Sequence, residues 1–268
     1  MNADDFGFTR DVNEGIIEAH QRGILTATTL MANGDAFDDA VRRARENEGL
    51  DIGAHLVLIG GKAVADRDRA LPSSVPRLLA AIAARRINIY KELSAQVRRI
   101  LETGIRLTHL DTHKHTHLAP PVLDGVVRVA EEFGIRWVRR PFDLPITAAR
   151  AGAKWDKRAT SGGMAFLRGR FHRVLAQHKC RATDHFAGFQ VTGRFRTPEL
   201  AALLRALPEG STELMCHPGH CGEELRSART RLKESREAEL NALTAAETRR
   251  AIEETGIDLV NYRVLDAL

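Results

Sequence analysis

The sequence predicts an α/β fold built around a parallel sheet, either a barrel or an open doubly wound sheet. Segments typical of strands alternate with segments of helical periodicity along the whole chain. Strands that are separated by helices run parallel, because each helix returns the chain to the same edge of the sheet. Polar residues also gather where the predicted strands end, and in α/β barrels the chemistry collects at the carboxyl ends of the strands.

The composition is consistent with one large domain that has a mostly aliphatic core. Of the 268 residues, 43% are hydrophobic and 5% are aromatic, and nothing demands a division into two domains. Three cysteines without a framework spacing predict a reducing compartment. We find no signal peptide and no apolar run long enough to span a bilayer. Together these features predict a soluble, cytoplasmic protein.

The chain is basic, with a formal net charge of +5 and a pI of about 9.4. A basic balance is typical of proteins that bind nucleic acids, anionic substrates or membrane surfaces. The arginines are spread over many predicted helices, however, and solvated helix faces explain that dispersion better than a binding stripe. Aromatic residues do not alternate with them, which argues against a stacking platform for single strands. We therefore expect no nucleic-acid partner.

In the first half of the chain, helices with an apolar stripe alternate with strands. Val12, Ile16 and Ala19 form such a stripe, and Gly23 is a natural helix stop. A strand before Asp4 would be very short, because the chain begins only three residues earlier. The predicted strands are 25–32, 51–59 and 105–110, and the predicted helices are 9–23, 35–47, 74–86, 88–103 and 121–133.

The second half begins with a predicted strand at 135–139 and is less regular from 142 to about 182. We interpret the irregular part as a peripheral excursion or lid within a single domain of residues 1–268, with a helix at about 163–178. The remaining predicted elements are helices at 197–206 and within the charged stretch 227–256, and strands at 213–216 and 257–264.

Residues 109–117 carry four histidines and an aspartate at every second position. On an extended backbone successive side chains point to opposite faces, so one face would carry His109, Asp111, His113, His115 and His117. Burying such a row unpaired is costly, and a divalent cation is its simplest partner. Two alternatives stay open. One is a solvated, histidine-rich loop, and the other is a helix, which the threonines of the segment disfavour.

Polar residues at five predicted strand ends suggest a site assembled from distant parts of the chain. They are Asp4–Asp5, His55, Asp111–His113, Arg139–Arg140 and His217. Each has a simpler explanation when taken alone, because an aspartate can cap a helix and a strand histidine is often a satisfied core residue. The convergence of all five at strand ends is hard to explain in that way.

This group of residues suits hydrolysis at a metal centre. Imidazoles and a carboxylate can hold a cation with positions left open for water, and a second carboxylate can act as general base. Asp4 and Asp5 could divide these tasks, because neighbours on an extended chain face different ways. Arg139 could orient the base and keep it ionised, and His217 could protonate the leaving group. Amide, ester and phosphoester substrates fit about equally well.

Two other arrangements fit less well. Cys216 and His217 suggest a thiol nucleophile, but adjacent strand residues point apart. A structural zinc within residues 216–221 would need four ligands crowded into six residues. The sequence has no P-loop and no glycine-rich dinucleotide fingerprint after a strand, so we expect no nucleotide cofactor.

At five places the chain resembles the YdjC family of carbohydrate deacetylases. The matching blocks occur in the family's order at 2–7 (NADDFG), 53–56 (GAHL), 108–115 (THLDTHKH), 183–188 (TDHFAG) and 213–219 (ELMCHPG). Weaker similarity at 12–17 and 25–29 extends the resemblance to most of the chain. One block alone would be modest evidence, whereas five in the same order are highly specific.

The resemblance implies a distorted (β/α) TIM-like barrel related to polysaccharide deacetylases. It also implies one divalent metal ion, held by Asp5, His55 and His113. Mg²⁺ and Zn²⁺ both suit such a ligand set. By similarity to the deacetylase pattern of two successive aspartates, Asp4 would be the general base.

The resemblance extends to the other catalytic groups and to the substrate. Arg139 resembles the arginine that supports the base, and His217 resembles the histidine on the leaving-group side. We assign substrate binding to Asp111, His115, His117, Asp184 and Phe186. Family members remove acetyl groups from N-acetylated sugars and tend to be dimers, so we expect a homodimeric carbohydrate N-deacetylase. The competing hypotheses are another metal hydrolase, such as a phosphoesterase, and a non-catalytic sugar- or lipid-binding relative.

Residues 55–62 (HLVLIGGK) are similar to a branch of the family that is associated with hopanoid biosynthesis gene clusters. This similarity implies an N-acetylglucosaminyl lipid as substrate, and the basic surface would then contact an anionic membrane face. The chain also departs from the family pattern. Family members carry several apolar residues before the block at 2–7, whereas only Met1 precedes it here. A lost first strand would loosen Asp4 and Asp5.

Overall fold

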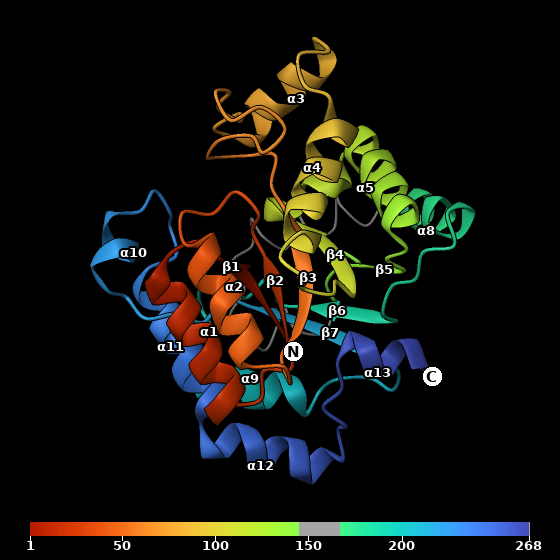
Figure 1. Cartoon of the computed structure of the whole chain (residues 1–268). Coiled ribbons are helices and arrows are strands. Elements are labelled where there is room, and N and C mark those ends of the chain that lie inside the picture. Colours follow the sequence, from red (N-terminus) through yellow and green to blue (C-terminus); the bar gives the residue numbers. More distant parts are fainter. Residues whose placement is uncertain (145–166, 268) are drawn as a thin grey trace.

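A curled sheet of parallel strands forms the centre of the molecule (Figure 1). The structure, a computed structural model, describes residues 1–144 and 167–267. Within these ranges seven strands follow the order β5-β4-β3-β2-β1-β7-β6, and every neighbouring pair is parallel. They are β1 (Asn2–Phe6), β2 (Ala27–Leu30), β3 (Asp51–Leu56), β4 (His109–Thr112), β5 (Trp137–Val138), β6 (His185–Ala187) and β7 (Thr212–Cys216). This arrangement confirms the predicted α/β class and is that of a distorted TIM-like barrel.

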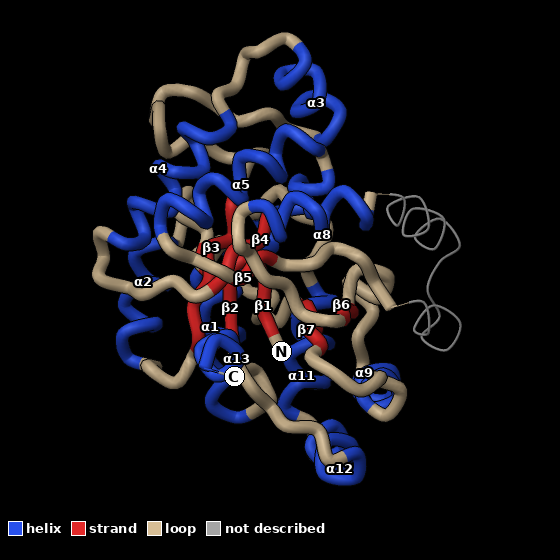
Figure 2. The backbone as a smooth tube through the Cα atoms, turned by 90° about the vertical axis from the view of Figure 1, so that its right-hand side faces the viewer, coloured by secondary structure: helices blue, strands red, loops and turns tan. Residues whose placement is uncertain are grey.

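Helices surround the strands, as Figure 2 shows. The described α-helices are α1 (Arg10–Arg22), α2 (Phe37–Glu46), α3 (Val75–Ala83), α4 (Ile89–Leu101), α5 (Pro120–Phe133), α8 (Arg168–Gln177), α9 (Thr197–Leu204), α10 (Glu223–Ser227), α11 (Glu234–Thr244), α12 (Ala246–Thr255) and α13 (Tyr262–Ala267), and the 3-10 helix is η1 (His113–Leu118). Capping side chains and glycines determine where several of these helices begin and end. The Thr9 hydroxyl caps α1 by accepting the Val12 N–H, and Gly134 ends α5 in the left-handed conformation. None of the described helices combines the length and apolar character needed to cross a membrane.

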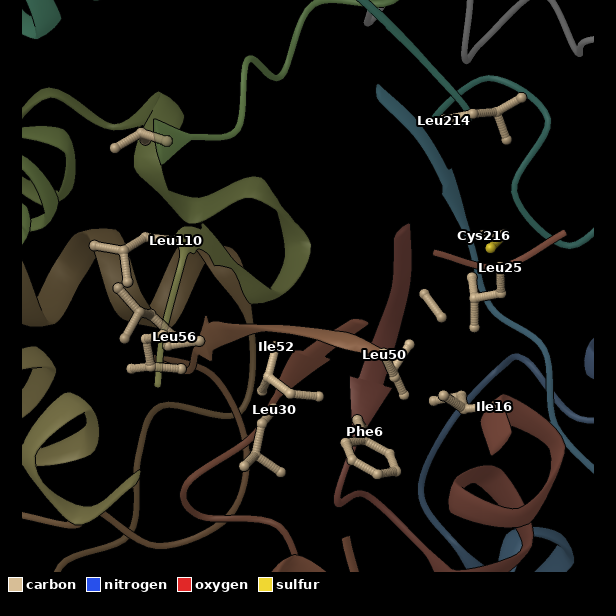
Figure 3. Close-up of a cluster of buried hydrophobic side chains, with 14 of the residues drawn as sticks. Phe6, Ile16, Leu25, Leu30, Leu50, Ile52, Leu56, Leu110, Leu214 and Cys216 are labelled. Carbon is tan, nitrogen blue, oxygen red and sulfur yellow. The ribbon is translucent and has the colours of Figure 1, made fainter. Parts of the chain in front are cut away.

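The core lies between the sheet and its helices and is mostly aliphatic. Figure 3 shows Phe6, Leu30 and Ile52 projecting from β1, β2 and β3, with Ile16 reaching them from α1. All four side chains are buried. Full burial of one side chain of this kind contributes roughly 1.5–3 kcal/mol. The packing therefore fixes the strands whose carboxyl ends carry the polar residues.

β1 lies inside the sheet, between β2 and β7. All five of its residues are buried, including Asp4 and Asp5. The pairing with β2 shifts in register between Ala3 and Phe6, so the two aspartates sit at an irregularity of the strand. The first strand is therefore present, and a neighbouring strand pairs with it on each side.

The two edge strands, β5 and β6, do not pair with each other within the described residues. Backbone hydrogen bonds link them through intervening segments, and Arg181 forms an isolated parallel bridge with Trp137. The Val138 N–H donates to the Arg181 carbonyl over 2.9 Å, and the Leu144 N–H donates to the Phe186 carbonyl over 2.9 Å. The barrel is therefore closed on this side by isolated hydrogen bonds and not by a regular pair of strands.

The predicted last strand at 257–264 is wrong. Residues 257–261 have no regular structure and α13 follows them. The Asp51 carboxylate, at the start of β3, accepts the N–H groups of Tyr262 and Arg263. A carboxylate in this place satisfies the first free N–H groups of a helix, so a partner far away in sequence overrides the local β-branched pattern.

The predicted excursion at 142–182 is described only at its two ends, because residues 145–166 lie outside the described residues. α8 coincides with the later part of the helix predicted at 163–178 and contacts α5. The predicted helices at 197–206 and within 227–256 correspond to α9, α11 and α12.

Candidate metal and catalytic site

The backbone turns sharply at the carboxyl end of β1. Asp5 has a φ of 71°, in the left-handed region that few non-glycine residues adopt, and Gly7 has a φ of 93°. The side-chain oxygen of Asn13 accepts the Gly7 N–H over 2.6 Å, which ties the turn to α1. This bulge separates the directions of two adjacent carboxylates, Asp4 and Asp5.

Asp5, His55 and His113 bring three ligand atoms together. Asp5 Oδ1 lies 3.4 Å from His55 Nε2 and 3.3 Å from His113 Nδ1, and the two nitrogens are 3.2 Å apart. Ligands at about 2.0–2.2 Å from one ion are separated by roughly 3.0–3.5 Å in tetrahedral or octahedral coordination. Among the described residues, the buried Asp5 Oδ1 has no hydrogen-bond partner. The triangle and this orphaned oxygen both fit a divalent cation.

His55 is oriented by a second carboxylate behind it. Its Nδ1 lies 2.7 Å from Asp111 Oδ1, and the Thr29 hydroxyl donates to Asp111 Oδ2 over 3.1 Å. This contact leaves the lone pair of Nε2 directed at the triangle. Burial lowers the pKa of His55, but the charge and hydrogen bond of Asp111, together with the Asp5 and Asp4 carboxylates, outweigh burial and raise the pKa to about 10. The carboxylates around this imidazole therefore favour positive charge at Nε2, which either a proton or a metal cation supplies.

Arg236 of α11 holds the other oxygen of Asp5. Its Nη2 donates to Asp5 Oδ2 over 2.5 Å, and both side chains are buried. Burial raises the pKa of Asp5, but the Arg236 guanidinium and the His113 and His55 imidazoles together outweigh burial and hold the pKa well below its usual value. Asp5 thus stays ionised with one oxygen fixed and the other directed at the two imidazoles.

Arg139, which follows β5, holds Asp4 at both oxygens. Its Nη1 and Nη2 donate to Asp4 Oδ2 and Oδ1 over 2.8 and 2.7 Å, and Arg139 is 0% exposed. The same guanidinium contacts Glu213 Oε1 at 2.7 Å and Asp111 Oδ2 at 2.6 Å. Burial raises the pKa of Asp4, but the charge and hydrogen bonds of Arg139, together with His55 and His217, outweigh burial and keep the pKa below its usual value. Asp4 is therefore an ionised, rigidly held carboxylate beside the triangle.

Carboxylates outnumber guanidiniums in this buried cluster. Four carboxylates, Asp4, Asp5, Asp111 and Glu213, surround two guanidiniums, Arg139 and Arg236. Burying unbalanced charge is costly. A divalent cation held by the Asp5 triangle would offset the excess negative charge.

His217 follows β7 and faces Asp4 from the other side. Its Nε2 lies 3.8 Å from Asp4 Oδ2 and its Nδ1 lies 3.9 Å from Glu239 Oε2. Both distances exceed a hydrogen bond. The His217 backbone N–H donates to Glu239 Oε2 over 2.5 Å. Burial lowers the pKa of His217 to about 4 and raises that of Glu239 to about 7. The imidazole is therefore neutral near pH 7 in a backbone position that Glu239 fixes.

The loop after His217 lies directly on α1. A Cβ atom on Gly15 would come within 2.4 Å of the Gly219 Cα, so this approach requires glycine. The Gly219 N–H also donates to the Arg236 carbonyl over 3.3 Å. Close packing of the loop against α1 and α11 places His217 at the site.

The histidine row does not share one face, contrary to the extended interpretation. β4 ends at Thr112, and η1 follows with left-handed φ values at Lys114 and His115. The Thr112 hydroxyl accepts the His117 N–H over 3.1 Å and contacts His117 Nδ1 at 2.6 Å. This side chain turns the segment back on itself. Of the four histidines, His113 alone reaches the triangle, and its side chain is 25% exposed.

Two of the residues that we assigned to substrate binding are buried and fully engaged with the protein. Asp111 is 0% exposed and contacts His55, Thr29 and Arg139. His117 contacts Thr112 through Nδ1 and donates from Nε2 to the Arg139 carbonyl over 3.1 Å. Neither side chain is open to a substrate, so the structure places both behind the site as supports.

Asp184 lies away from the site. It precedes β6, whereas the metal triangle lies at the carboxyl ends of the strands. Its Oδ2 accepts hydrogen bonds from the Ser211 N–H and hydroxyl, over 2.9 and 2.7 Å. The structure therefore gives Asp184 a local role in joining β6 to the segment before β7.

His115 and Phe186 lie beside the Asp4 half of the site. The Arg139 guanidinium lies 5.7 Å from the Phe186 ring centroid, and the His115 ring meets Phe186 edge-on at 5.7 Å. Among the described residues, the buried Nδ1 of His115 has no hydrogen-bond partner. These two side chains form a mostly apolar wall next to Asp4.

His109 supports Asp4 indirectly. Its Nε2 lies 3.0 Å from the side-chain oxygen of Asn2, whose amide donates to Asp4 Oδ1 over 3.5 Å.

Residues 216–221 form no metal cluster within the described part of the chain. The candidate groups there are Asp5, His55 and His113, and Asp4, His55 and Asp111. Both groups share His55, so they describe one centre.

Sequence analysis missed three residues of this cluster: Glu213, Arg236 and Glu239. The pattern at 227–256 predicts only a charged helical segment, and so it does not single out Arg236 or Glu239. The available signal was spacing, because Arg236, Leu240 and Leu243 lie at i, i+4 and i+7 and so share the buried face of α11. A charged residue on an apolar helix face is a candidate for a buried ion pair.

The family model described as YdjC-like protein matches residues 1–254. Curated proteins from Brevibacillus brevis and Geobacillus stearothermophilus, both named carbohydrate deacetylase, are each 32% identical to the chain. They cover 99% and 98% of it and are themselves covered over 98% and 96% of their length. The crystal structure of a proposed cellobiose-phosphate cleavage protein from Enterococcus faecalis superposes with a TM-score of 0.75 at 27% identity, with 98% of this chain and 97% of that chain covered. The fold, the order of the polar blocks and these matches together show that the chain belongs to the YdjC-like protein family.

Proposed function

We propose that this protein is a metal-dependent carbohydrate N-deacetylase, which hydrolyses the acetyl amide of an N-acetylated sugar. The names of its full-length relatives support the reaction and the substrate class. The observation that carries the metal dependence is the buried, unpartnered Asp5 Oδ1 within 3.4 Å of two imidazole nitrogens. When bound there, a cation would polarise the acyl oxygen and lower the pKa of water. Two imidazoles and one carboxylate suit Zn²⁺ or Mg²⁺.

Asp4 acts as the general base in this proposal. It takes a proton from the attacking water while the new bond to the acyl carbon forms. Its ionisation supports this role, because the Arg139 guanidinium keeps the Asp4 pKa below its usual value. Arg139 also fixes the carboxylate through two hydrogen bonds, which reduces the reorganisation that proton transfer requires.

His217 acts on the leaving group. It donates a proton to the amine nitrogen as the carbon–nitrogen bond breaks, so the products are acetate and the free amino sugar. Its position opposite the Asp4 carboxylate, at 3.8 Å, supports this role. Because burial keeps this imidazole neutral near pH 7, the proton that it gives to the amine is the one that Asp4 has taken from the water. His115, which is 6% exposed, contacts the sugar or its acetyl group in this proposal, and the fully buried Phe186 packs against its ring.

Acetate release distinguishes this proposal from its competitors. The purified protein is loaded with Zn²⁺ or Mg²⁺ and given N-acetylglucosaminyl compounds and, separately, phosphate monoesters. We expect acetate from the first and no phosphate from the second. Phosphate release without acetate release would establish a phosphoesterase. Sugar binding without turnover, unchanged in Asp4→Asn, would establish a non-catalytic relative.

Four further features belong to the proposal. We propose that residues 1–268 form one deacetylase domain with a peripheral excursion at about 142–182. We propose a homodimer, as the family resemblance implies, and light scattering of the purified protein tests this. We propose a cytoplasmic location, which the three free cysteines support. The similarity of residues 55–62 to a hopanoid-associated branch supports a glycolipid as substrate.

A further inference from the structure

The surface of α3 is apolar where it faces solvent. Of its nine residues (VPRLLAAIA) only Arg77 is polar, yet only Leu78 is buried. Val75 and Leu79 are 42% and 48% exposed, and they are two of the four exposed large hydrophobic side chains among the described residues. A surface helix normally turns charged or polar residues to water. α3 does the reverse, and an exposed apolar face of this kind marks an interaction site.

α3 stands away from the body of the protein in both views (Figures 1 and 2). Leu78 anchors it to the core. Val75, Leu79 and Ala83 are spaced four residues apart, so they share one face of the helix. All three are exposed. Within the described part of the chain, no other helix or strand packs extensively on α3.

The segment around α3 carries most of the net charge of the protein. Residues 60–90 contain six basic residues, Lys62, Arg67, Arg69, Arg77, Arg85 and Arg86, and two acidic ones, Asp66 and Asp68. The difference, 6 − 2, is +4, against +5 for the whole chain. All six basic side chains are exposed, and none forms an ion pair within the described residues. The sequence suggested dispersed arginines, whereas this segment combines unpaired cations with an apolar face.

The segment rises from the same end of the sheet as the candidate site. It begins shortly after β3, and His55 lies one residue before the end of that strand. The Asn33 amide donates to the Lys62 carbonyl over 3.1 Å, and the Gln96 side chain bonds both the N–H and the carbonyl of Val57. These contacts fix the base of the segment, so α3 is presented in a defined direction.

We propose that α3 and its basic flanks form a docking surface for an anionic lipid bilayer. Amphipathic helices bind such surfaces by burying apolar side chains at the acyl-chain boundary while lysines and arginines meet anionic headgroups. The exposed Val75 and Leu79 supply the first element, and the exposed Arg85 and Arg86, which follow the helix, supply the second. This inference stands apart from the deacetylase proposal, because it concerns where the protein sits and not what it hydrolyses.

A second copy of the chain fits this surface less well. A two-fold contact through α3 would place the same patch of each protomer against the other. The six unpaired cations of both copies would then approach one another, and like charges across an interface are unfavourable. An anionic bilayer complements the charge of the patch as well as its apolar character.

Vesicle sedimentation tests the proposal directly. The full chain is mixed with vesicles of phosphatidylcholine alone or with about one third phosphatidylglycerol. We expect binding to the anionic vesicles only, and loss of binding at high salt, because the Debye length falls to about 3 Å at 1 M. Equal binding to both vesicle types, or no binding to either, would overturn the proposal.

Paired variants separate the two elements of the surface. Arg85→Gln with Arg86→Gln should weaken binding by about 30-fold, since each basic residue near such a membrane contributes roughly a factor of five. Val75→Ser with Leu79→Ser should weaken it by about tenfold or more. The matched controls are Arg229→Gln with Arg231→Gln, and Leu259→Ser with Val264→Ser, which alter exposed residues elsewhere. Controls that weaken binding as much as the α3 variants would contradict the assignment.

Light scattering and thermal melting complete the test. The α3 variants should keep the melting temperature and the oligomeric state of the wild type, because the altered side chains are exposed. A change from dimer to monomer with unaltered vesicle binding would show that a second copy occupies α3, and would refute the bilayer proposal.

Discussion

Asp4 and Asp5 are chain neighbours, yet the structure places them in two different environments. Both oxygens of Asp4 are held by Arg139. Asp5 is held by Arg236 at one oxygen, and its other oxygen faces two imidazoles. Burial and a guanidinium act on both carboxylates, so ionisation does not distinguish them. The difference lies in the unpartnered oxygen, which makes Asp5 suitable as a metal ligand and leaves Asp4 available as a base.

Removing an imidazole from the Asp5 side should have the largest effect. We expect His113→Ala to lose bound metal and to reduce deacetylase activity to background, because two remaining ligands hold a cation poorly. Metal analysis and acetate release on the same preparation check this. His220→Ala is the matched control, since His220 contacts Glu18 outside the site. Retention of one ion per chain in His113→Ala would contradict the ligand assignment.

Changing the Asp4 side should remove catalysis while the metal stays bound. Asp4→Asn keeps the shape of the side chain and its side-chain oxygen can still accept a hydrogen bond from Arg139, but it cannot take up a proton. Loss of a general base reduces rates by about 10²–10⁴-fold. We expect kcat to fall by that amount with little change in KM. Wild-type turnover in this variant would exclude Asp4 as the base.

Of the two buried arginines, Arg236 should affect metal binding, because it holds Asp5. Arg236→Gln releases Asp5 Oδ2 and should weaken metal affinity by about 10–100-fold, as loss of groups that orient metal ligands does. Titration of the metal-free protein with Zn²⁺ measures this, with Arg205→Gln, just after α9, as a control at an exposed ion pair. If Arg236→Gln binds Zn²⁺ as tightly as the wild type, Arg236 does not position Asp5.

The smallest predicted effect concerns Glu239, which fixes the His217 backbone. Burial raises its pKa from 4.5 to about 7, so the folded protein binds more protons than the unfolded chain between these values. Stability should therefore fall as pH rises through this window, by up to about 3 kcal/mol. Glu239→Gln should remove much of that decline, and Glu254→Gln should not. Thermal melts of the metal-free protein from pH 4 to pH 8 check this. If the stability of the wild type and of Glu239→Gln declined equally as pH rises, the Glu239 carboxyl would not have a raised pKa in the folded protein.

A local sequence pattern can mark a residue as a candidate without showing its role. His55 interrupts an apolar strand, and such an interruption signals either a core contact or a ligand. The strand-and-helix alternation was sufficient to predict the α/β class, because crossover connections leave few alternatives. Assignment of separate roles to Asp4 and Asp5 came from the family resemblance, and the bulge that separates them has no clear local signal.

The failures share a physical cause, which is a side-chain partner that periodicity does not reveal, whether it lies five residues away or far along the chain. The row at 109–117 turns because the Thr112 hydroxyl bonds His117, and α13 replaces a predicted strand because Asp51 caps it. Arg236 and Glu239 were missed because a charged residue in a helix is usually solvated. The exposed face of α3 could not be predicted either, because its apolar sequence is typical of a buried helix.

Metal content of the two aspartate variants tests the central claim most directly. Wild type, Asp4→Asn and Asp5→Asn are purified in parallel, loaded with Zn²⁺, desalted and analysed by mass spectrometry for metal per chain. We expect one ion per chain in the wild type and in Asp4→Asn, and a large loss in Asp5→Asn. Equal metal content in the two variants, whether high or low, would contradict the division of roles between the adjacent carboxylates.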